Sequence, residues 1–209
     1  MGSQAGRNTD VSDLWLDRWL PRIVEAGKDG RVFEVGCGEG RDSVVLLRAG
    51  LSVTGIDINL VAVERAREKA TAFAQSSRFL SQDVRAVFPV EPGSIDVVLA
   101  SLSLHYFSWA ETVDLVRRLR AIAKPSGVLL ARFNATDDYH FGARRHRDAT
   151  SEIEPDYYLV EGSPKRFLNR LAVERLLSEC WRIEAIEHLT INRYTQPKRV
   201  WEAFARAMA

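Results

Sequence analysis

At 209 residues the chain has the length of one ordinary domain, enough to bury a core without disulfides or metal ions. Hydrophobic residues make up 46% and charged residues 27%, as in a typical globular protein, and no apolar run is long enough to cross a bilayer. The formal net charge of +1 gives no general attraction to nucleic acid or to an anionic membrane, so we expect small-molecule partners.

The first element predicted along the chain is an amphipathic helix over residues 10–23, where apolar side chains recur at helical spacing. Ser12 and Asp13 can cap its start. Trp15 and Trp19 lie one turn apart on one face of this helix. They either pack the helix against the body of the protein, which is the simpler interpretation, or close it over a cofactor cleft.

Residues 31–43 combine an apolar strand, a glycine-rich turn and the start of a helix. The strand part is apolar enough to be covered on both faces, as in a parallel sheet. Gly36, Gly38 and Gly40 follow at every second position, and glycine allows another molecule to approach the backbone closely. The helix predicted from Asp42 directs N–H groups and its positive dipole end at this turn, which favours an anionic or polar ligand.

The spacing of these glycines excludes two common nucleotide-binding motifs. A dinucleotide fingerprint counted from Gly36 needs a third glycine where Arg41 stands, and the Gly-Lys-Ser/Thr end of a P-loop is missing. The pattern is instead Glu34-x-Gly36-x-Gly38-x-Gly40, an acid within the strand and then alternating glycines. It resembles the first motif of class I S-adenosylmethionine-dependent methyltransferases, although a glycine-rich turn in another α/β protein is the simpler alternative. The resemblance implies that the loop wraps the methionine part of the cofactor, with Glu34 near its ammonium group.

A second strand is predicted over residues 51–57, and it ends in Asp57, 21 positions after Gly36 (57 minus 36). In nucleotide-binding α/β folds an acid at this place accepts hydrogen bonds from ribose hydroxyls. S-adenosylmethionine also carries a ribose, and its two hydroxyls suit the paired acceptors of a carboxylate. Ile58 would then lie against the adenine. Alternatively, Asp57 only caps the helix that we predict over residues 60–73.

A third and less apolar strand is predicted over residues 78–83, as expected at the edge of a sheet. Asp83 and Val84 match the position where the family binds adenine. By the resemblance, the side chain takes the amino group and the next backbone N–H meets a ring nitrogen. A turn acid would explain Asp83 almost as well.

The elements predicted next are a fourth strand over residues 94–101, a helix over residues 109–123 and a fifth strand over residues 128–133. Pro125 and Gly127 end the helix. Together with the Leu-His pair that ends in His105, this order resembles the second half of the same methyltransferase core. The resemblance then covers about residues 31–133.

The last third of the chain has a different composition. Residues 135–167 show no clean periodicity and are longer than an ordinary connection, so we predict a substrate lid beyond the carboxyl ends of the strands. The apolar spacing predicts a helix over residues 169–180 and a long strand over residues 182–194. The alanines of residues 199–207 favour a helix, but the family closes its sheet with an antiparallel hairpin, and we predict a strand.

The expected fold is therefore α/β, with a Rossmann-like, doubly wound and mostly parallel seven-stranded sheet in a three-layer α-β-α arrangement. The last strand is expected to be antiparallel. We expect a single methyltransferase domain over residues 1–209, with an N-terminal helix in residues 1–30 and the lid insertion in residues 135–167.

The resemblance implies a set of cofactor-binding residues for S-adenosylmethionine. They are Glu34, Gly36, Cys37, Gly38, Gly40, Asp57, Ile58, Asp83, Val84 and Ser101. The implied reaction is nucleophilic displacement at the methyl of a sulfonium, which leaves S-adenosylhomocysteine. Because the cofactor carries an activated electrophile, the protein has to hold the nucleophile in line and exclude water.

The catalytic candidates come directly after the fourth strand. His105 is the first candidate for a general base, since its ordinary pKa lies near neutrality, although many relatives carry this histidine without catalytic use. Tyr106 is the second candidate. Arg132, at the end of the fifth strand, would either pair with a substrate carboxylate or form a salt bridge that ends the strand. Tyr139 and His140 are further candidates for substrate contact.

The residues just after the fourth strand disfavour several methyltransferase subclasses. DNA adenine methyltransferases place Asn/Asp-Pro-Pro-aromatic there, and catechol-type enzymes place a metal-binding aspartate where Ser101 stands. Cytosine C5 enzymes need a Pro-Cys nucleophile, and neither cysteine follows a proline. Asn134, Asp137 and Asp138 alone are too few oxygen ligands for a hard cation, so we expect no metal.

The compact size and the Gly-Arg-Asp-Ser end of the first motif are similar to the tellurite-resistance and thiopurine group, which hints at a small acceptor. We expect a monomer or homodimer that binds a small-molecule methyl acceptor, with no nucleic acid or membrane partner. Cys37 and Cys180 form neither a disulfide framework nor a zinc spacing, which fits the cytoplasm. Methylation of RNA or protein, and cofactor binding without turnover, are the alternatives.

Overall fold

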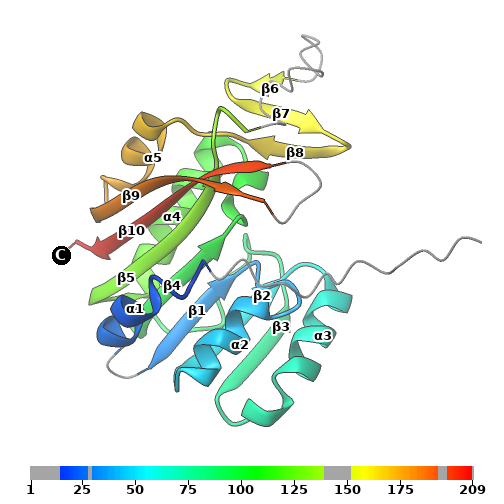
Figure 1. Cartoon of the computed structure of the whole chain (residues 1–209), viewed down its shortest axis with the longest axis vertical. Coiled ribbons are helices and arrows are strands. Elements are labelled where there is room, and N and C mark those ends of the chain that lie inside the picture. Colours follow the sequence, from blue (N-terminus) through cyan, green and yellow to red (C-terminus); the bar gives the residue numbers. More distant parts are fainter. Residues whose placement is uncertain (1–14, 28–29, 139–151, 193–196, 209) are drawn as a thin grey trace, which may run out of the picture.

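The computed structural model describes residues 15–27, 30–138, 152–192 and 197–208 (Figure 1). Within these residues seven strands form one sheet in the order β3-β2-β1-β4-β5-β10-β9. The strands are β1 (Arg31–Val35), β2 (Ser52–Asp57), β3 (Ser77–Ser81), β4 (Ile95–Ser101), β5 (Ala123–Asn134), β9 (Trp181–Ile191) and β10 (Lys198–Ala207). Strands β1 to β5 are parallel, and β10 runs antiparallel between β5 and β9. The predicted sheet, its antiparallel end and the edge position of β3 are confirmed.

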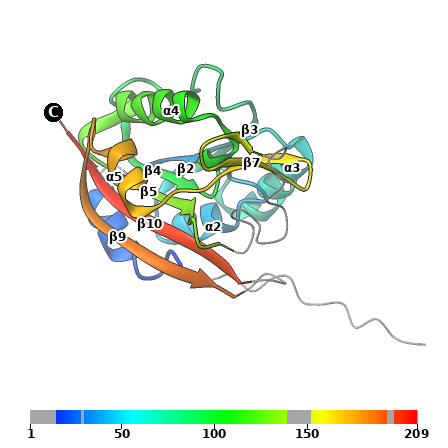
Figure 2. The same cartoon turned by 90° about the horizontal axis from the view of Figure 1, so that it is seen from above.

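Helices cover both faces of this sheet (Figure 2). They are α1 (Leu20–Ala26), α2 (Arg41–Arg48), α3 (Leu60–Lys69), α4 (Trp109–Ile122) and α5 (Arg170–Leu177), with the 3-10 turns η1 (Thr71–Phe73) and η2 (Leu104–Tyr106). Buried residues such as Ile23, Leu46 and Val63 pack α1, α2 and α3 on one face. Leu119 and Val173 belong to the core on the other face, under α4 and α5. The three-layer arrangement is confirmed.

The N-terminal helix begins later than predicted. Helix α1 starts at Leu20, residues 15–19 form turns, and residues 10–14 lie outside the described part of the chain. Pro21 stands in the first turn of α1, where its missing N–H costs nothing, so the sequence supplies a start signal there. Trp15 and Trp19 are both buried, and the Trp19 ring stacks on Phe204 at 5.4 Å between centroids. Their role in packing is confirmed.

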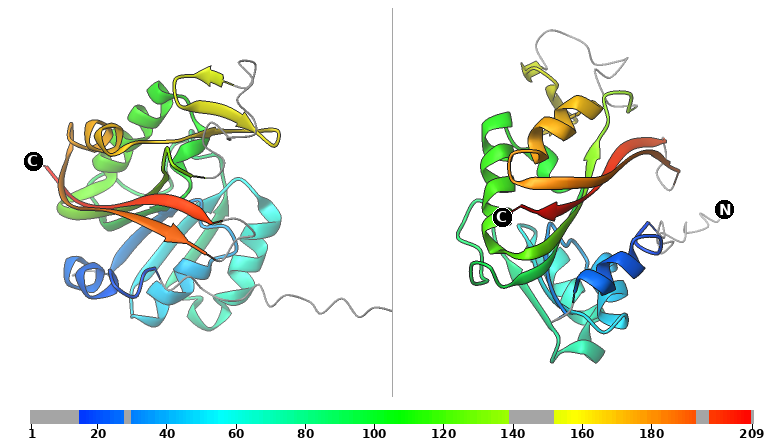
Figure 3. Two further views of the ribbon diagram at one scale, coloured as in Figure 1. Left: turned by 45° about the horizontal axis from the view of Figure 1, so that its top comes forward. Right: turned by 90° about the vertical axis from the view of Figure 1, so that its left-hand side faces the viewer.

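The predicted lid contains regular structure instead of an aperiodic loop. Its described part is a three-stranded antiparallel sheet of β6 (Glu152–Glu154), β7 (Tyr157–Val160) and β8 (Ser163–Arg166), which we call the accessory sheet. It lies beyond one end of the main sheet (Figure 3), where β8 contacts η2. Two tight turns build it: Asp156 has φ 60°, and Glu161 and Gly162 have φ 51° and 79°. In the sequence the second turn is Glu161-Gly162, and a glycine in a two-residue turn is a hairpin signal. The prediction of an aperiodic loop overlooked this signal.

The remaining differences concern element boundaries. The helix predicted over residues 60–73 is divided at Ala70 into α3 and η1. Strand β5 begins at Ala123 instead of the predicted Val128, because Ala123 already pairs with Ile95 of β4. Among the described residues, no helix is long and apolar enough to cross a membrane.

Candidate functional site

Two cavities open where the carboxyl ends of β1, β2 and β4 meet, as expected for a parallel α/β sheet. The first has a volume of about 340 Å³, and its lining includes Gly36, Asp57, Ile58, Asp83, Val84 and Tyr106. The second has a volume of about 460 Å³, and its lining includes Glu34, Gly36, Cys37, Gly38, Ser101, His105 and Tyr106. Gly36, Leu102 and Tyr106 line both cavities, so the two adjoin. The structure thus brings together nearly all of the predicted cofactor residues.

The glycine-rich loop between β1 and α2 forms the floor of this site. The backbone N–H groups of Gly36 and Cys37 both donate to the carbonyl of Ile56, at 2.8 and 3.0 Å, which fixes the loop to β2. Gly36 has φ +69°, and a Cβ there would stand 2.5 Å from the Cβ of Ser103. Gly38 has φ +51° and faces open space. Gly36 is therefore needed for packing, whereas Gly38 leaves a bare backbone toward the cavity.

Asp57, at the tip of β2, accepts hydrogen bonds with both carboxylate oxygens. Oδ2 accepts from the N–H of Gly38 and Oδ1 from the N–H of Asn59, each at 2.9 Å. The cap of α3 is Asn59, whose side chain accepts from the N–H of Ala62. The alternative in which Asp57 only caps that helix is therefore wrong. Its carboxylate orders the glycine loop and borders the first cavity.

Glu34 is a buried carboxylate at the second cavity. It accepts a hydrogen bond from the hydroxyl of Ser43 in α2. Burial raises the pKa of Glu34 well above its ordinary value, and the negative charge of Asp42 raises it further. Among the described residues no ion pair supplies a cation to Glu34. A ligand with an ammonium group would supply that missing positive charge.

The adenine end of the predicted site is less constrained. Ile58 is largely exposed, so its side chain is available to cover a flat ring from the first cavity. The carboxylate of Asp83 is held by Arg85, whose Nη2 lies 2.5 Å from Oδ2, and this ion pair keeps the pKa of Asp83 below its usual range. Val84 lines the same cavity. The adenine assignment of Asp83 and Val84 stays a prediction.

His105 and Tyr106 lie in η2, directly beyond β4. His105 is 4% exposed and lines the second cavity, whereas Tyr106 is 44% exposed and lines both. In the described part of the chain no group forms a hydrogen bond with Nδ1 of His105. Burial lowers the pKa of His105 well below its ordinary value, and the charges of Lys198 and Lys165 lower it further. His105 is therefore neutral at neutral pH and only weakly basic.

Arg132 does not reach into either cavity, and its surroundings favour the salt-bridge alternative. Its side chain is 2% exposed, and its Nε lies 3.4 Å from Oε1 of the equally buried Glu202. The guanidinium lies over the ring of Trp15, 4.5 Å from its centroid. Trp19 also donates to Glu202, at 2.8 Å. Arg132 thus belongs to a buried polar cluster that fixes the N-terminal segment to β5 and β10.

Other cavity residues were missed in the sequence. Gln82, Arg85, Ser103 and Phe107 border the first cavity, and Glu39, Arg41, Asp42 and Lys198 border the second. Most of these residues are close in the sequence to predicted ones, and this closeness was the signal that could have identified them. Lys198 carries no such signal. Gly40 lines neither cavity; it packs against α3, where an added Cβ would stand 2.9 Å from the Cβ of Ala66. Tyr139 and His140 lie outside the described residues.

Metal ligands do not converge in this site. Among the described residues, no group of three or more His, Cys, Asp or Glu side chains is arranged to hold a metal ion. Cys37 is buried in the glycine loop, and burial raises its pKa, so it is a thiol at neutral pH.

Comparison with known proteins identifies the core of the chain. Residues 32–127 match the family described as "Methyltransferase domain". This match and the fold support a class I S-adenosylmethionine-dependent methyltransferase core in residues 32–127. The cofactor of this class fits the site, because Glu34 is a buried acid to which the described residues supply no cation, and Gly38 leaves space beside the loop.

Individual relatives of this methyltransferase domain differ in what they act on. A ribosomal RNA small subunit methyltransferase C of Alcanivorax borkumensis is 36% identical over 107 residues, covering 49% of this chain and 32% of the relative. A ubiquinone biosynthesis O-methyltransferase of Xanthomonas campestris pv. campestris is 31% identical over 127 residues, covering 60% of this chain and 52% of the relative. The chain therefore spans about half the length, or less, of these curated relatives.

Solved structures share the fold over nearly the whole chain. A SAM-dependent methyltransferase of Methanosarcina mazei has a TM-score of 0.71 at 19% identity, covering 85% of this chain and 92% of that one. A 1,6-didemethyltoxoflavin-N1-methyltransferase of Burkholderia thailandensis, with bound 1,6-didemethyltoxoflavin and S-adenosylhomocysteine, has a TM-score of 0.70 at 16% identity, covering 96% and 80%. At these identities the likeness concerns the fold. The narrower resemblance to the tellurite-resistance and thiopurine group is not confirmed.

Proposed function

We propose that this chain transfers a methyl group from S-adenosylmethionine to a nucleophilic atom of a small-molecule acceptor, leaving S-adenosylhomocysteine. The observation that carries the proposal is the pair of cavities that adjoin at Gly36, Leu102 and Tyr106. One cavity has the acid-tipped strand suited to a ribose, and the other has the buried carboxylate suited to an ammonium group. A sulfonium nucleoside with an amino-acid tail has both features.

Each part of the cofactor has a candidate partner. Glu34 would hold the ammonium group, since a cation there favours the ionised form of this buried acid. The bare backbone at Gly38 would lie against the methionine part, and Asp57 would accept hydrogen bonds from the ribose hydroxyls. Asp83 and Val84 would face the adenine. Tyr106, which lines both cavities, would stand near the junction of the two parts.

The chain's own residues have a limited chemical task in this proposal. The bound cofactor supplies a methyl group that is already activated toward nucleophiles. The walls of the second cavity then have to orient the acceptor and exclude water. His105 is neutral and faces this cavity, so it can take a proton from an acidic acceptor, but its lowered pKa makes it a poor base for an alcohol or an amide.

A small acceptor is favoured over RNA or protein by charge. The net charge of +1 provides no general attraction to a polyanion. The Burkholderia structure is named for a small-molecule substrate, and the Xanthomonas relative for ubiquinone biosynthesis. The Alcanivorax relative, named for ribosomal RNA, keeps RNA as the second candidate. The predicted cytoplasmic location and the monomeric or dimeric state stay predictions.

The first experiment measures cofactor binding by calorimetry with S-adenosylmethionine, S-adenosylhomocysteine and NAD. We expect the first two to bind and NAD not to bind. The second incubates the protein and tritiated S-adenosylmethionine with a whole-cell extract, and follows label that has left the cofactor in the acid-soluble and the acid-precipitated fractions. New labelled compounds in the soluble fraction, separated from the cofactor by chromatography, support a small acceptor, whereas label confined to precipitated RNA or protein contradicts it. Tight binding of the cofactor without transfer to either fraction would support a module without turnover.

A further inference from the structure

The segment between β4 and α4, residues 102–108, carries both catalytic candidates and begins at a strained residue. Leu102 has a left-handed φ of 53°, a conformation that is unfavourable for a leucine. Such a conformation persists only where the surrounding contacts fix it. Leu102 and Tyr106 line both cavities, so a shift of this segment would change the walls of the whole site. The contacts that fix the segment are therefore part of the site.

The two ends of this segment are fixed by the methyltransferase core. A Cβ at Gly36 would stand 2.5 Å from the Cβ of Ser103, so the glycine-rich loop lies directly against the start of the segment. The N–H of Leu102 donates to the carbonyl of Arg132 at 3.1 Å, and Ser108 caps α4 through a capping box. The middle of the segment is η2, a short 3-10 turn that cannot satisfy its own last carbonyl groups. Donors for these carbonyls have to come from elsewhere in the chain.

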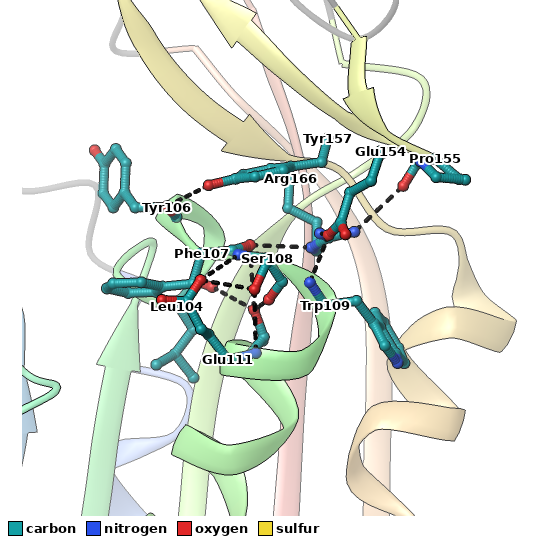
Figure 4. Close-up of polar contacts among 11 residues, drawn as sticks. Leu104, Tyr106, Phe107, Ser108, Trp109, Glu111, Glu154, Pro155, Tyr157 and Arg166 are labelled. Atoms are coloured by element: carbon teal, nitrogen blue, oxygen red, sulfur yellow. Dashed lines mark hydrogen bonds and ion pairs between the residues drawn. The ribbon is translucent and has the colours of Figure 1, made fainter.

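The accessory sheet supplies donors to two consecutive carbonyls at the end of η2 (Figure 4). The hydroxyl of Tyr157 donates to the carbonyl of Tyr106 at 2.8 Å. The Nε of Arg166 donates to the carbonyl of Phe107 at 3.2 Å. The hydroxyl of Thr112 is shared among three carbonyls and lies 3.4 Å from that of Phe107, so the bond from Arg166 is the shorter one there. Both bonds reach backbone atoms and therefore fix the course of the turn itself.

Tyr157 and Arg166 act on the turn as one unit. They lie directly opposite each other in β7 and β8, and cross-strand partners share one face of a sheet. The guanidinium of Arg166 lies over the ring of Tyr157, 4.7 Å from its centroid. Both side chains are buried against the core of the protein. The neighbouring pair, Tyr158 and Lys165, lies on the opposite face of the accessory sheet and is partly exposed.

Glu154, in β6, connects Arg166 to the first turn of α4 (Figure 4). It forms an ion pair with Arg166 and accepts a hydrogen bond from the backbone N–H of Trp109 at 2.6 Å. An acid at this place is also favoured by the positive end of the helix dipole. Nη1 of Arg166 donates in addition to the carbonyl of Pro155 at 3.3 Å. Because several contacts hold its guanidinium, Arg166 keeps one orientation toward Phe107.

We propose that Tyr157 and Arg166 are positioning residues for methyl transfer, which hold η2 by its backbone and so keep the side chain of Tyr106 at the junction of the two cavities. This inference rests on the proposed methyltransferase function and extends the active site to the accessory sheet, outside the matched residues 32–127. Neither Tyr157 nor Arg166 lines the two cavities, so both act through the turn. The ring centroids of Tyr106 and His105 are 4.1 Å apart, and a displaced Tyr106 would also change the packing of His105.

The test reads the position of Tyr106 by fluorine NMR on the full chain labelled with 3-fluorotyrosine. The chain has five tyrosines, and Tyr106→Phe identifies the resonance of Tyr106. We expect this resonance to shift when S-adenosylhomocysteine is added to the wild-type protein, since Tyr106 lines both cavities. Tyr157→Phe should displace the resonance in the ligand-free protein and remove more than half of the ligand-induced shift. Tyr158→Phe, which removes a hydroxyl that donates to Glu152 within the accessory sheet, is the matched control and should leave the resonance unchanged.

A second variant and a rate measurement separate positioning from stability. Arg166→Lys keeps a charge beside Glu154 but lacks the fork of donors that reaches the carbonyls of Phe107 and Pro155, so it should also displace the Tyr106 resonance. The tritium-transfer assay in a whole-cell extract measures the reaction. Tyr157→Phe should lower the maximal rate about tenfold and keep the KM for S-adenosylmethionine within about twofold of the wild-type value. A merely structural role would lower the free energy of unfolding in urea and leave the rate of the folded protein unchanged.

The outcomes distinguish this inference from the function on which it rests. An unchanged Tyr106 resonance in Tyr157→Phe would overturn the inference, as would a wild-type maximal rate in that variant, and both would leave the methyltransferase proposal intact. An equal displacement in Tyr158→Phe would assign the effect to the accessory sheet as a whole and also overturn the inference. Failure of the wild-type protein to bind S-adenosylhomocysteine would overturn the proposed function and with it the role in methyl transfer, while the ligand-free spectra would still show whether Tyr157 fixes Tyr106.

Discussion

Replacing Asp57 by asparagine probes the cofactor site at the point where loop, strand and ligand meet. In the structure, the two carboxylate oxygens accept from the backbone N–H groups of Gly38 and Asn59, each at 2.9 Å. Each oxygen has a second lone pair, so both can also accept a ribose hydroxyl. Asparagine has the same shape but one acceptor oxygen, and its amide nitrogen cannot accept from either N–H. The substitution therefore removes the charge and one half of the acceptor pair.

The size of the effect can be worked from these contacts. A hydrogen bond to a charged group contributes about 1.5–3 kcal/mol and one between neutral groups about 0.5–1.5 kcal/mol, so losing the charge costs about 1 kcal/mol for each ribose hydroxyl. The hydroxyl that faces the new amide nitrogen also loses its acceptor. Because Asp57 is partly exposed, water replaces some of what is lost. We expect a loss of about 1–3 kcal/mol in binding, or roughly 5- to 150-fold in affinity.

Calorimetric titration with S-adenosylhomocysteine measures this change for the Asp57→Asn protein. The matched control is Asn59→Ala, which removes the cap of α3 but keeps the backbone N–H that donates to Asp57. That control should lose about 1 kcal/mol of unfolding free energy in urea and keep its affinity. A correctly folded Asp57→Asn protein with wild-type affinity would refute the reasoning and place the ribose elsewhere.

Three further predictions concern the loop and the core. Gly38→Ala should lower the free energy of unfolding by about 1 kcal/mol, because residue 38 has a left-handed φ. The free energy of S-adenosylhomocysteine binding, measured by calorimetry, should fall by more than that amount, since the added methyl enters the cavity. Because the pKa of Glu34 is raised in the folded protein, Glu34 stabilises the ligand-free protein below pH 4.5, the ordinary pKa of a glutamate, and this contribution is lost as the pH rises through the folded-state pKa. Glu34→Gln should remove this pH dependence from the free energy of unfolding measured in urea. Glu202→Gln removes the carboxylate charge beside the buried Arg132, at a cost of about 3–5 kcal/mol in urea unfolding, whereas the exposed Glu187→Gln should cost under about 1 kcal/mol.

The part of the site that could be predicted is the part encoded by local sequence. The loop from Glu34 to Gly40 and the acid at Asp57 lie at the ends of neighbouring parallel strands, and parallel strands bring such ends to one edge of a sheet. Their backbone contacts, such as Gly38 to Asp57, result from that placement. Short-range glycine spacing and strand periodicity were therefore sufficient to predict that these residues gather at one edge of the sheet.

The rest depends on contacts between distant segments. Lys198 reaches the second cavity because β10 is inserted between β5 and β9, a strand order that periodicity does not reveal. Arg132 is turned toward Glu202 and Trp15 by packing of the N-terminal segment, so its position at a strand end was a misleading signal. The accessory sheet was missed because its strands are three or four residues long, too short for a periodic pattern to be recognised.

The matched residues 32–127 carry only one half of the site. They contain the glycine loop, Asp57 and η2, which are the groups assigned to the cofactor and to the reacting centre. Lys198 of β10, which lines the second cavity, and β8, which contacts η2, lie outside that region. Under the proposed function, acceptor preference can therefore change through these strands while cofactor binding stays the same. Relatives that match only the core need not share an acceptor with this chain, which agrees with the different substrates in their names.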